Sequence, residues 1–125
     1  MNINIKATNI ELTDSINSYL YKKLEVFEMF EKEDVEVLVF AEVGKTTNHH
    51  KHGDYHRAEF KMVINGEKFY TFSEKEDLYK SIDIARDDLL RKVKNSMKKR
   101  NSLIRRGASK IKGMIKGISG GRIFK

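Results

Sequence analysis

The sequence predicts an α+β domain in which two helices pack on one face of a four-stranded sheet, in the order β-α-β-β-β-α. Four short segments alternate apolar and polar residues, as half-buried strands do. Two longer segments repeat apolar residues every three or four positions, as amphipathic helices do. Both helix stripes and the inward strand faces must be buried, and placing the two helices on one sheet face buries them all.

The first two elements are a strand and a helix. Residues 2–8 alternate, with Ile3, Ile5 and Ala7 on one face. Thr13 belongs to the residue types that cap helix N-termini well. A helix of about 18 residues is expected to follow, with one apolar stripe formed by Ile16, Leu20, Leu24, Phe27 and Phe30.

Three strands are expected next. Residues 35–43 alternate, and the polar stretch 44–56 with its two glycines is expected to form a long loop. Residues 57–64 and 67–73 alternate again, and the Asn65-Gly66 pair between them predicts a type I′ hairpin turn. The turn sets a register that pairs Ile64 with Glu67, Met62 with Phe69 and Phe60 with Thr71, and it places Ala58, Phe60, Met62, Ile64 and Phe69 on the core face.

A long helix completes the domain. It is expected to begin at a capping box over residues 73–76, with Asp77 as a second candidate N-cap. No Gly or Pro interrupts it before Gly107, and five glycines lie in residues 107–125. We therefore expect a domain over residues 1–106 and a basic, Gly-rich tail over residues 107–125 that orders on its partner. The apolar stripe of the helix consists of Leu78, Ile82, Ala85, Leu89, Val93 and Met97.

Charge is distributed unevenly along the chain. Residues 89–125 contain thirteen Lys and Arg and no Asp or Glu, whereas residues 1–88 hold all eighteen acids and twelve bases. The net charge of +7 is therefore the sum of −6 and +13. A basic block of this size repels itself unless it meets a polyanion, so nucleic acid is the first expected partner and an anionic membrane surface the second.

Several function classes find no support in the sequence. There is no Cys, which excludes disulfides and thiolate metal sites. No apolar run is long enough to span a membrane, and no signal peptide is visible, so a cytoplasmic protein is expected. There is no nucleophile elbow, P-loop or HExxH motif, so we expect no catalytic residue, no cofactor and no small-molecule substrate.

The candidate RNA-binding residues are basic. Four of them fall in one narrow sector of the last helix, opposite its apolar stripe. A solvated helix face is the alternative interpretation, but such faces usually mix charge signs for i,i+4 pairing, and no acid follows Asp88. The full set comprises the helix sector Lys80, Arg91, Lys94 and Lys98, its extension Lys99, Arg100, Arg105 and Arg106, Lys110 and Lys112 of the tail, Lys22 and Lys23 of the first helix, and Lys51 and Arg57 of the loop.

Two further groups of residues have side chains that could form a binding site. His49, His50, His52 and His56 cluster in the loop, but without Cys and with Asp54 as the only nearby carboxylate, a polar loop is favoured over a zinc site. The rings of Tyr70 and Phe72 would suit a base-stacking platform on the outer face of the sheet. No RNP-like motif surrounds them, so partial burial is the favoured interpretation.

Two motifs resemble the ribosome hibernation-promoting factors, a family also called ribosome-associated inhibitor A or sigma-54 modulation proteins. Residues 11–16 (ELTDSI), with Lys-Lys-Leu at 22–24 and Glu-Met-Phe at 28–30, are similar to the opening helix of that family. Residues 76–83 (EDLYKSID) are similar to the family's junction between the last strand and the last helix. The resemblance covers about residues 1–100.

The resemblance implies a fold similar to double-stranded-RNA-binding domains and a non-enzymatic role. It implies binding to rRNA of the small ribosomal subunit across the tRNA and mRNA sites, with ribosomal proteins lining the mRNA channel as further partners. Arg91 matches a family arginine of the last helix, whereas Asp88 and Asn95 stand where basic residues are common. The long family members carry an extra C-terminal dimerisation domain, which is not expected in a chain of this length.

Other functions stay open at this point. A general RNA-binding or RNA-chaperone module would use the same basic face, and competition with tRNA for the small subunit would separate it from a hibernation factor. A metal-dependent enzyme would need metal bound to the loop histidines. A membrane role for the tail would rest on the helical spacing of Ile111, Ile115 and Ile118, which glycines weaken.

Overall fold

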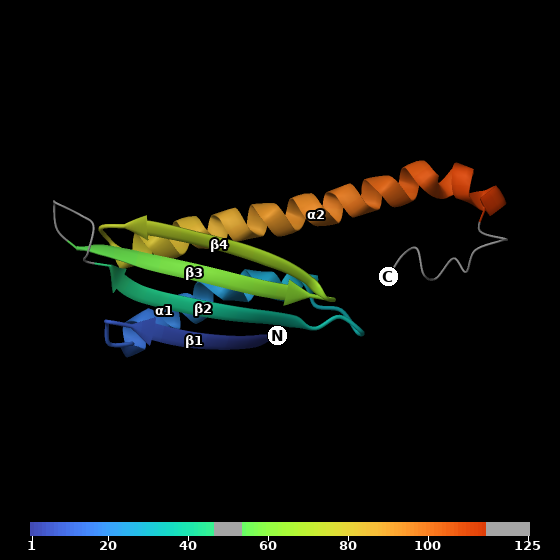
Figure 1. The fold of residues 1–125 in the computed structure, drawn as a ribbon. Coiled ribbons are helices and arrows are strands. Elements are labelled where there is room, and N and C mark those ends of the chain that lie inside the picture. Colours follow the sequence, from blue (N-terminus) through green and yellow to red (C-terminus); the bar gives the residue numbers. More distant parts are fainter. Residues whose placement is uncertain (47–53, 115–125) are drawn as a thin grey trace. The chain divides into compact units, whose positions relative to one another are not determined.

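The computed structural model describes residues 1–46 and 54–114, with side chains through Asn101 (Figure 1). The chain divides into two compact units, Met1–Lys92 and Val93–Lys125, and each is described by itself. The observed order of elements confirms the β-α-β-β-β-α prediction, with one short 3₁₀ helix added. The elements are β1 (Asn2–Thr8), α1 (Asp14–Leu24), the 3₁₀ helix η1 (Glu25–Phe30), β2 (Val37–Thr46), β3 (Tyr55–Ile64), β4 (Glu67–Lys75) and α2 (Leu78–Met114).

The four strands form one sheet in the order β1-β2-β3-β4. β1 runs parallel to β2, and the other neighbours are antiparallel. The hairpin between β3 and β4 turns through Asn65 at φ 50° and Gly66 at φ 85°, the left-handed conformations that a type I′ turn requires. The three cross-strand pairs expected from this turn are all present, so the predicted register is confirmed.

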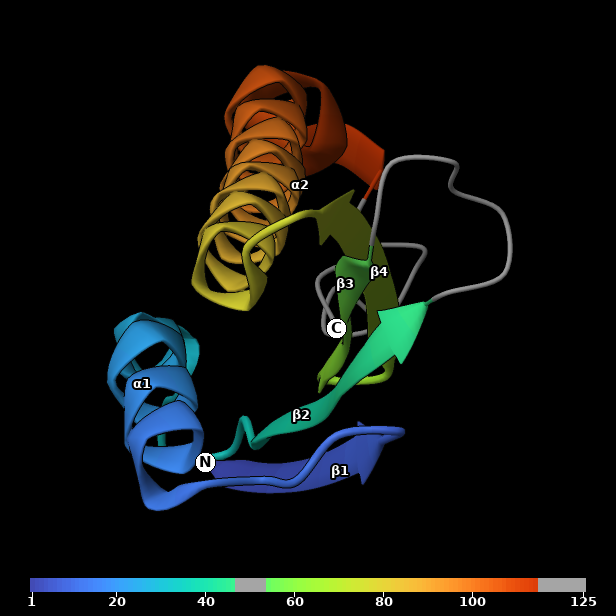
Figure 2. The same cartoon turned by 90° about the vertical axis from the view of Figure 1, so that its left-hand side faces the viewer.

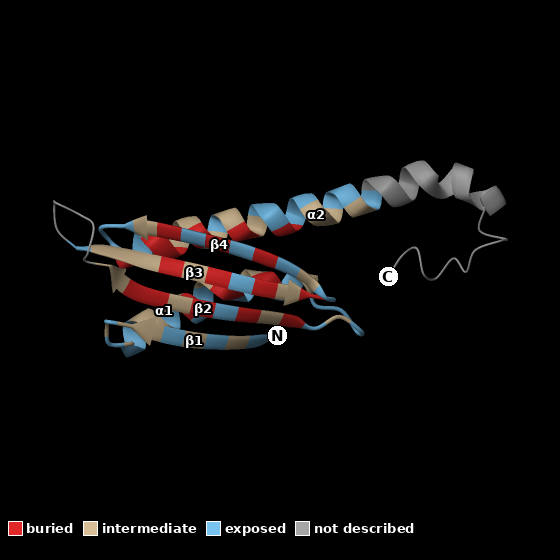
Figure 3. Ribbon diagram, in the orientation of Figure 1, coloured by how far each residue is buried: buried red, intermediate tan, exposed pale blue. Residues whose placement is uncertain are grey.

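The core lies on one face of the sheet. Figure 2 shows α1 and the first turns of α2 on the same side of the strands, and Figure 3 shows buried and exposed residues alternating along β2, β3 and β4. The Thr71 hydroxyl, itself buried, donates a 2.9 Å hydrogen bond to the Ala85 carbonyl and ties β4 to α2. The buried apolar residues of the first unit include Leu20, Leu24, Phe27, Val39, Phe60, Met62, Ile82 and Leu89.

The first helix differs from the single helix predicted by the sequence. Its α-helical part ends at Leu24, and the chain continues as η1. The apolar stripe changes its spacing at the same residue, from four positions before Leu24 to three between Leu24, Phe27 and Phe30. A 3₁₀ helix has three residues per turn, so this spacing keeps Phe27 buried and Phe30 half-buried on one side. Thr13 caps α1 as expected, because its hydroxyl accepts a 3.2 Å hydrogen bond from the Ile16 amide.

The loop after β2 is shorter than the expected stretch 44–56. β2 extends to Thr46 and β3 begins at Tyr55, and the two ends pair in register. Gly44 lies opposite Thr8, and a Cβ atom at this position would lie 2.7 Å from the Thr8 carbonyl oxygen. The missing side chain therefore permits the close approach of β1 to β2 at this end of the sheet.

α2 begins and ends differently from the expectation. Ser73 lies buried within β4, so it does not cap the helix. Asp77 takes that role, because its carboxylate accepts a 3.0 Å hydrogen bond from the Tyr79 amide. The helix continues through Gly107 and Gly113 to Met114, since each glycine costs a long helix only about 1 kcal/mol. The predicted division into residues 1–106 and 107–125 stays a prediction.

A polar cluster joins α1 to α2. The Tyr19 hydroxyl donates a 2.6 Å hydrogen bond to the Asp83 carboxylate, and the Lys23 ammonium lies 3.3 Å from the same carboxylate. The rings of Tyr19 and Tyr79 pack edge to face at 4.8 Å. The hydrogen bond to Asp83, followed by burial, raises the pKa of Tyr19 to about 12. The cluster thereby fixes the spacing of the two helices at the N-terminal end of α2.

Leu89→Ala should destabilise the protein by roughly 2–5 kcal/mol, because Leu89 is fully buried and the truncation leaves a cavity. Urea denaturation followed by circular dichroism measures the loss. The matched control is Lys80→Ala on the exposed side of the same helix, which should change the free energy of unfolding by less than about 0.5 kcal/mol. Equal effects of the two substitutions would show that the helix is rotated relative to this description.

Tyr19→Phe should lower the free energy of unfolding at pH 7 by about 0.5–1.5 kcal/mol, because it removes the hydrogen bond to Asp83. The pKa of Tyr19 is raised in the folded state from 10.0 to about 12, so the contribution of this tyrosine is complete below pH 10 and disappears as the pH rises towards 12. Urea denaturation of wild type and variant across this range should show the difference shrinking. Tyr21→Phe, an exposed position on the same helix, is the control, and equal losses in both variants would contradict the role of the Tyr19 hydroxyl.

Candidate nucleic-acid interface

Among the described side chains, the exposed face of α2 carries five of the predicted RNA-binding residues. Lys80 and Arg91 are exposed in the first unit, and Lys94, Lys98 and Lys99 are exposed in the second. The apolar stripe predicted for this helix is confirmed, because Leu78, Ile82, Ala85, Leu89 and Val93 are buried and Met97 is half-buried. Lysine and arginine side chains on the opposite side of the stripe therefore face solvent, as a phosphate-binding surface requires.

Arg91 is held in place by its neighbour on the helix. Its guanidinium donates a 2.8 Å hydrogen bond to the Asp88 carboxylate, one turn earlier, while 65% of its side chain stays exposed. Asp88 therefore orients the arginine and offsets part of its positive charge. A solvent-exposed pair of this kind is weak, and a phosphate can replace the carboxylate.

The lysines of α1 are placed differently from each other. Lys22 is exposed at the end of the helix. Lys23 belongs to the cluster that joins the helices, where its ammonium lies near Asp83 and 5.4 Å from the centre of the Tyr19 ring. Its charge is therefore partly compensated within the protein, and Lys22 is the more available of the two.

Arg57 lies on the face of the sheet that the helices leave open. Its guanidinium contacts Glu59 at 3.0 Å and Glu74 at 3.1 Å, and it lies 4.0 Å from the centre of the Phe72 ring. The Tyr70 hydroxyl completes this network by donating a hydrogen bond to Glu59, and this bond, with the nearby Arg57, holds the pKa of the Glu59 carboxyl below its usual value. Arg57 is therefore separated from the α2 face and already paired.

Several predicted residues lie where the structure gives no side chains. Lys51 lies outside the described residues, as do His49, His50 and His52. Arg105, Arg106, Lys110 and Lys112 belong to α2, but only their backbone is described. Arg100 is half-buried.

The structure places His56 in β3 rather than in the loop. Its ring Nδ1 lies 3.0 Å from the Glu76 carbonyl oxygen, and its own carbonyl accepts a 2.8 Å hydrogen bond from the Ser81 hydroxyl. Over residues 1–46 and 54–114, no three metal-ligating side chains come together at one point. The same ranges contain no helix that is long and apolar enough to cross a membrane.

Lys92 is a candidate that the sequence reasoning missed. Its ammonium donates a 2.8 Å hydrogen bond to the Tyr70 carbonyl and so joins α2 to β4. A groove of about 300 Å³ runs along this junction, and it is lined by Tyr70, Thr71, Phe72, Asp88, Arg91 and Lys92. The position of Lys92 beside Arg91 in the acid-free segment was the available signal, but its contact with β4 depends on the tertiary fold.

The sheet aromatics are more exposed than the sequence suggested. Tyr70 keeps 41% of its surface exposed and Phe72 keeps 50%, whereas partial burial was expected. Both rings project from the outer face of β4, with their centres 6.1 Å apart. The open face of the sheet thus presents aromatic rings to solvent close to the basic residues Arg91 and Lys92.

Comparisons with known proteins agree with this architecture. Over most of its length the chain is similar to ribosome hibernation promoting factors, with 27% identity to that of Pseudomonas putida over 88% of this chain and the whole of the relative. The factor of Escherichia coli K12 is 26% identical over 74% of this chain and 90% of the relative.

Solved structures show the same fold. The N-terminal domain of Protein Y from Thermus thermophilus superposes with a TM-score of 0.65 at 30% identity, over 76% of this chain and 98% of that domain. A ribosomal subunit interface protein from Coxiella burnetii superposes with a TM-score of 0.58 at 12% identity, which shows a shared fold. Residues 3–101 match the family model described as sigma 54 modulation protein / S30EA ribosomal protein. The chain therefore belongs to the sigma 54 modulation protein / S30EA ribosomal protein family.

Proposed function

We propose that the protein is a ribosome hibernation factor that binds rRNA of the small ribosomal subunit across the tRNA and mRNA sites. Bound there, it inhibits translation sterically and protects idle ribosomes. Membership of a family of non-enzymatic ribosome-associated factors supports the general role. The observation that carries the RNA contact is the exposed basic face of α2, on which no acid follows Asp88.

The mechanism needs occupancy and no covalent step. A folded domain fills the space that tRNA and mRNA would use, and phosphate contacts from α2 hold it there. Structured rRNA is recognised mainly through its shape and backbone, and a fixed row of basic side chains on a helix suits that recognition. The hydrogen bond between Lys92 and Tyr70 and the cluster around Asp83 hold the part of α2 that belongs to the first unit on the sheet, so Lys80 and Arg91 are presented in a fixed arrangement.

The proposed partners and location follow from this role. The partners are rRNA of the small subunit and ribosomal proteins that line the mRNA channel, and the compartment is the cytoplasm. A general RNA-binding or RNA-chaperone module is the second candidate, because the same basic face of α2 would also bind the phosphates of other RNAs. Competition separates the two functions, since a hibernation factor should lose binding to small subunits when tRNA is already bound.

Binding to small ribosomal subunits should weaken steeply with salt, because each Lys or Arg that contacts a phosphate releases counterions. For six or more such contacts the affinity should fall by about 10³-fold or more between about 50 and 200 mM salt. Co-sedimentation with purified subunits through sucrose gradients at several salt concentrations gives the slope. An affinity that is independent of salt over this range would rule out the electrostatic mechanism.

Reversing the charge of the α2 face should separate binding from folding. The triple variant Arg91→Glu, Lys94→Glu, Lys98→Glu should bind small subunits at least about tenfold more weakly, while its melting temperature stays close to that of wild type, because all three positions are exposed. The matched control is Lys6→Glu, Lys32→Glu, Lys75→Glu, which changes the net charge equally at exposed positions outside α2. Equal losses in both variants would assign binding to overall charge rather than to this face.

A further inference from the structure

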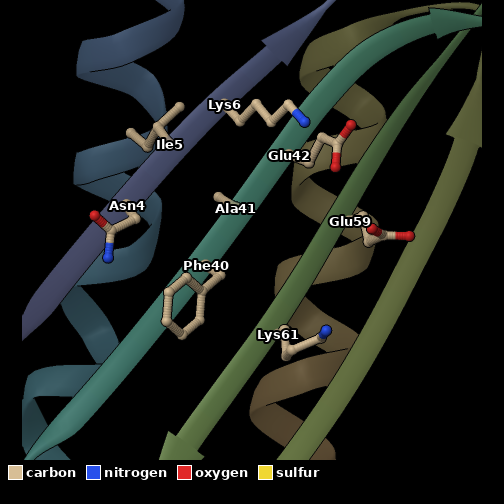
Figure 4. Close-up of a pocket in the computed structure, with 8 residues that line it drawn as sticks. All are labelled: Asn4, Ile5, Lys6, Phe40, Ala41, Glu42, Glu59 and Lys61. Atoms are coloured by element: carbon tan, nitrogen blue, oxygen red, sulfur yellow. The ribbon is translucent and has the colours of Figure 1, made fainter.

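The outer face of the sheet carries an aromatic patch that the proposed mechanism does not use. The patch consists of Phe40, Lys61, Val63, Lys68 and Tyr70, and together with Phe69 these residues line a groove of about 520 Å³. Phe40 is 44% exposed and Tyr70 is 41% exposed. Figure 4 shows Phe40 and Lys61 on the side of the strands that faces away from the helices. Within the described part of the chain, both helices cover the opposite face, so the patch is open to solvent.

The register places the two rings in one row. Phe40 of β2 pairs with Lys61 of β3, and Lys61 pairs with Tyr70 of β4. Neighbouring strands lie about 4.8 Å apart, so the backbone positions that carry the two rings are about 10 Å apart, with that of the lysine between them. Two flat apolar surfaces with a cation between them match two bases of a single strand and the phosphate that joins them.

The charges around this row favour a polyanion. The first row of outward residues consists of Asn4, Phe40, Lys61 and Tyr70, and the next row consists of Asn2, Leu38, Val63 and Lys68. Together the two rows contain two lysines and no acid. Further along the same face, Glu59 and Glu74 both pair with Arg57, and Glu42 lies opposite Lys6 and accepts a hydrogen bond from the Thr8 hydroxyl. A hydrophobic protein interface would be expected to have few lysines at its centre, whereas Lys61 lies between the two rings.

The patch also continues into the candidate RNA interface. The groove between β4 and α2 brings Tyr70 and Phe72 beside Arg91 and Lys92, all within the first compact unit. The Tyr70 ring is held in place, since its hydroxyl bonds to Glu59 and to the Arg57 guanidinium. A single RNA strand that contacts the basic side of α2 can therefore continue over β4 and reach an aromatic surface that is already formed.

We infer that the aromatic patch binds unpaired, single-stranded RNA, with bases stacked on Phe40 and Tyr70 and phosphates near Lys61 and Lys68. The inference deepens the proposed function and rests on it, because it names a second RNA contact on the same protein. It also assigns the kind of RNA, since stacking on side chains needs bases that are free of a partner strand.

The test measures binding of the full chain to a fluorescein-labelled 12-nucleotide single-stranded RNA by anisotropy, with a duplex of the same sequence as comparison. Phe40→Ala and Tyr70→Ala should each weaken single-strand binding about tenfold and leave duplex binding within about twofold. Phe40→Leu keeps an apolar side chain but removes the ring, so it should lose nearly as much as Phe40→Ala. Tyr21→Ala, a comparably exposed tyrosine on α1, is the matched control and should change nothing.

The same variants separate this inference from the proposed function. If Phe40→Ala and Tyr70→Ala bind the single strand as wild type does, the patch inference is overturned, even if the α2 triple variant still loses binding to small subunits. If Phe40→Leu binds the single strand as wild type does while Phe40→Ala does not, an apolar contact rather than ring stacking accounts for the binding, and the inference fails. It also fails if the wild-type chain self-associates in size-exclusion chromatography and Phe40→Ala abolishes this, because a second copy would then cover the patch.

Discussion

Burial of two apolar helix stripes against one face of the sheet is the constraint on which the rest of the structure depends. Because side chains alternate along a strand, covering one face assigns every second residue of β2, β3 and β4 to the core and leaves the others open. The same packing sets the rotation of α2, since Leu89 and its stripe must point inward. The direction in which the basic side chains point is therefore a consequence of core packing rather than of any contact between charges.

Charged residues have different roles in residues 1–88 and in residues 89–125. In residues 1–88 many acids pair nearby, as Glu59 and Glu74 do with Arg57 and as Asp83 does with Lys23. Beyond Asp88 the sequence contains no acid, and Arg91 pairs back to Asp88 itself. The first group of charges holds the domain together, and the second remains available to an anionic partner.

Most of the fold could be predicted because its periodic patterns are long and consistent. The Asn65-Gly66 turn determined the register of β3 and β4, and the stripe from Leu78 determined the buried side of α2. The errors fall where local sequence is ambiguous. Residues 44–46 look like loop until β1 supplies a partner for Gly44, and Ser73 looks like a cap until β4 extends through it. The role of Lys92 and the exposure of Tyr70 depend on which elements meet in space, which no periodicity shows.

The parallel pairing of β1 with β2 has a consequence for the order in which the sheet can assemble during synthesis. Of the four strands, β1 is synthesised before its backbone partner β2, which begins only at Val37, after α1 and η1. β3 and β4, by contrast, are joined by a two-residue turn and can pair as soon as both have emerged. During synthesis β1 therefore stays unpaired until β2 has been made. The β3–β4 hairpin is made later but can form by local pairing as soon as both strands are available.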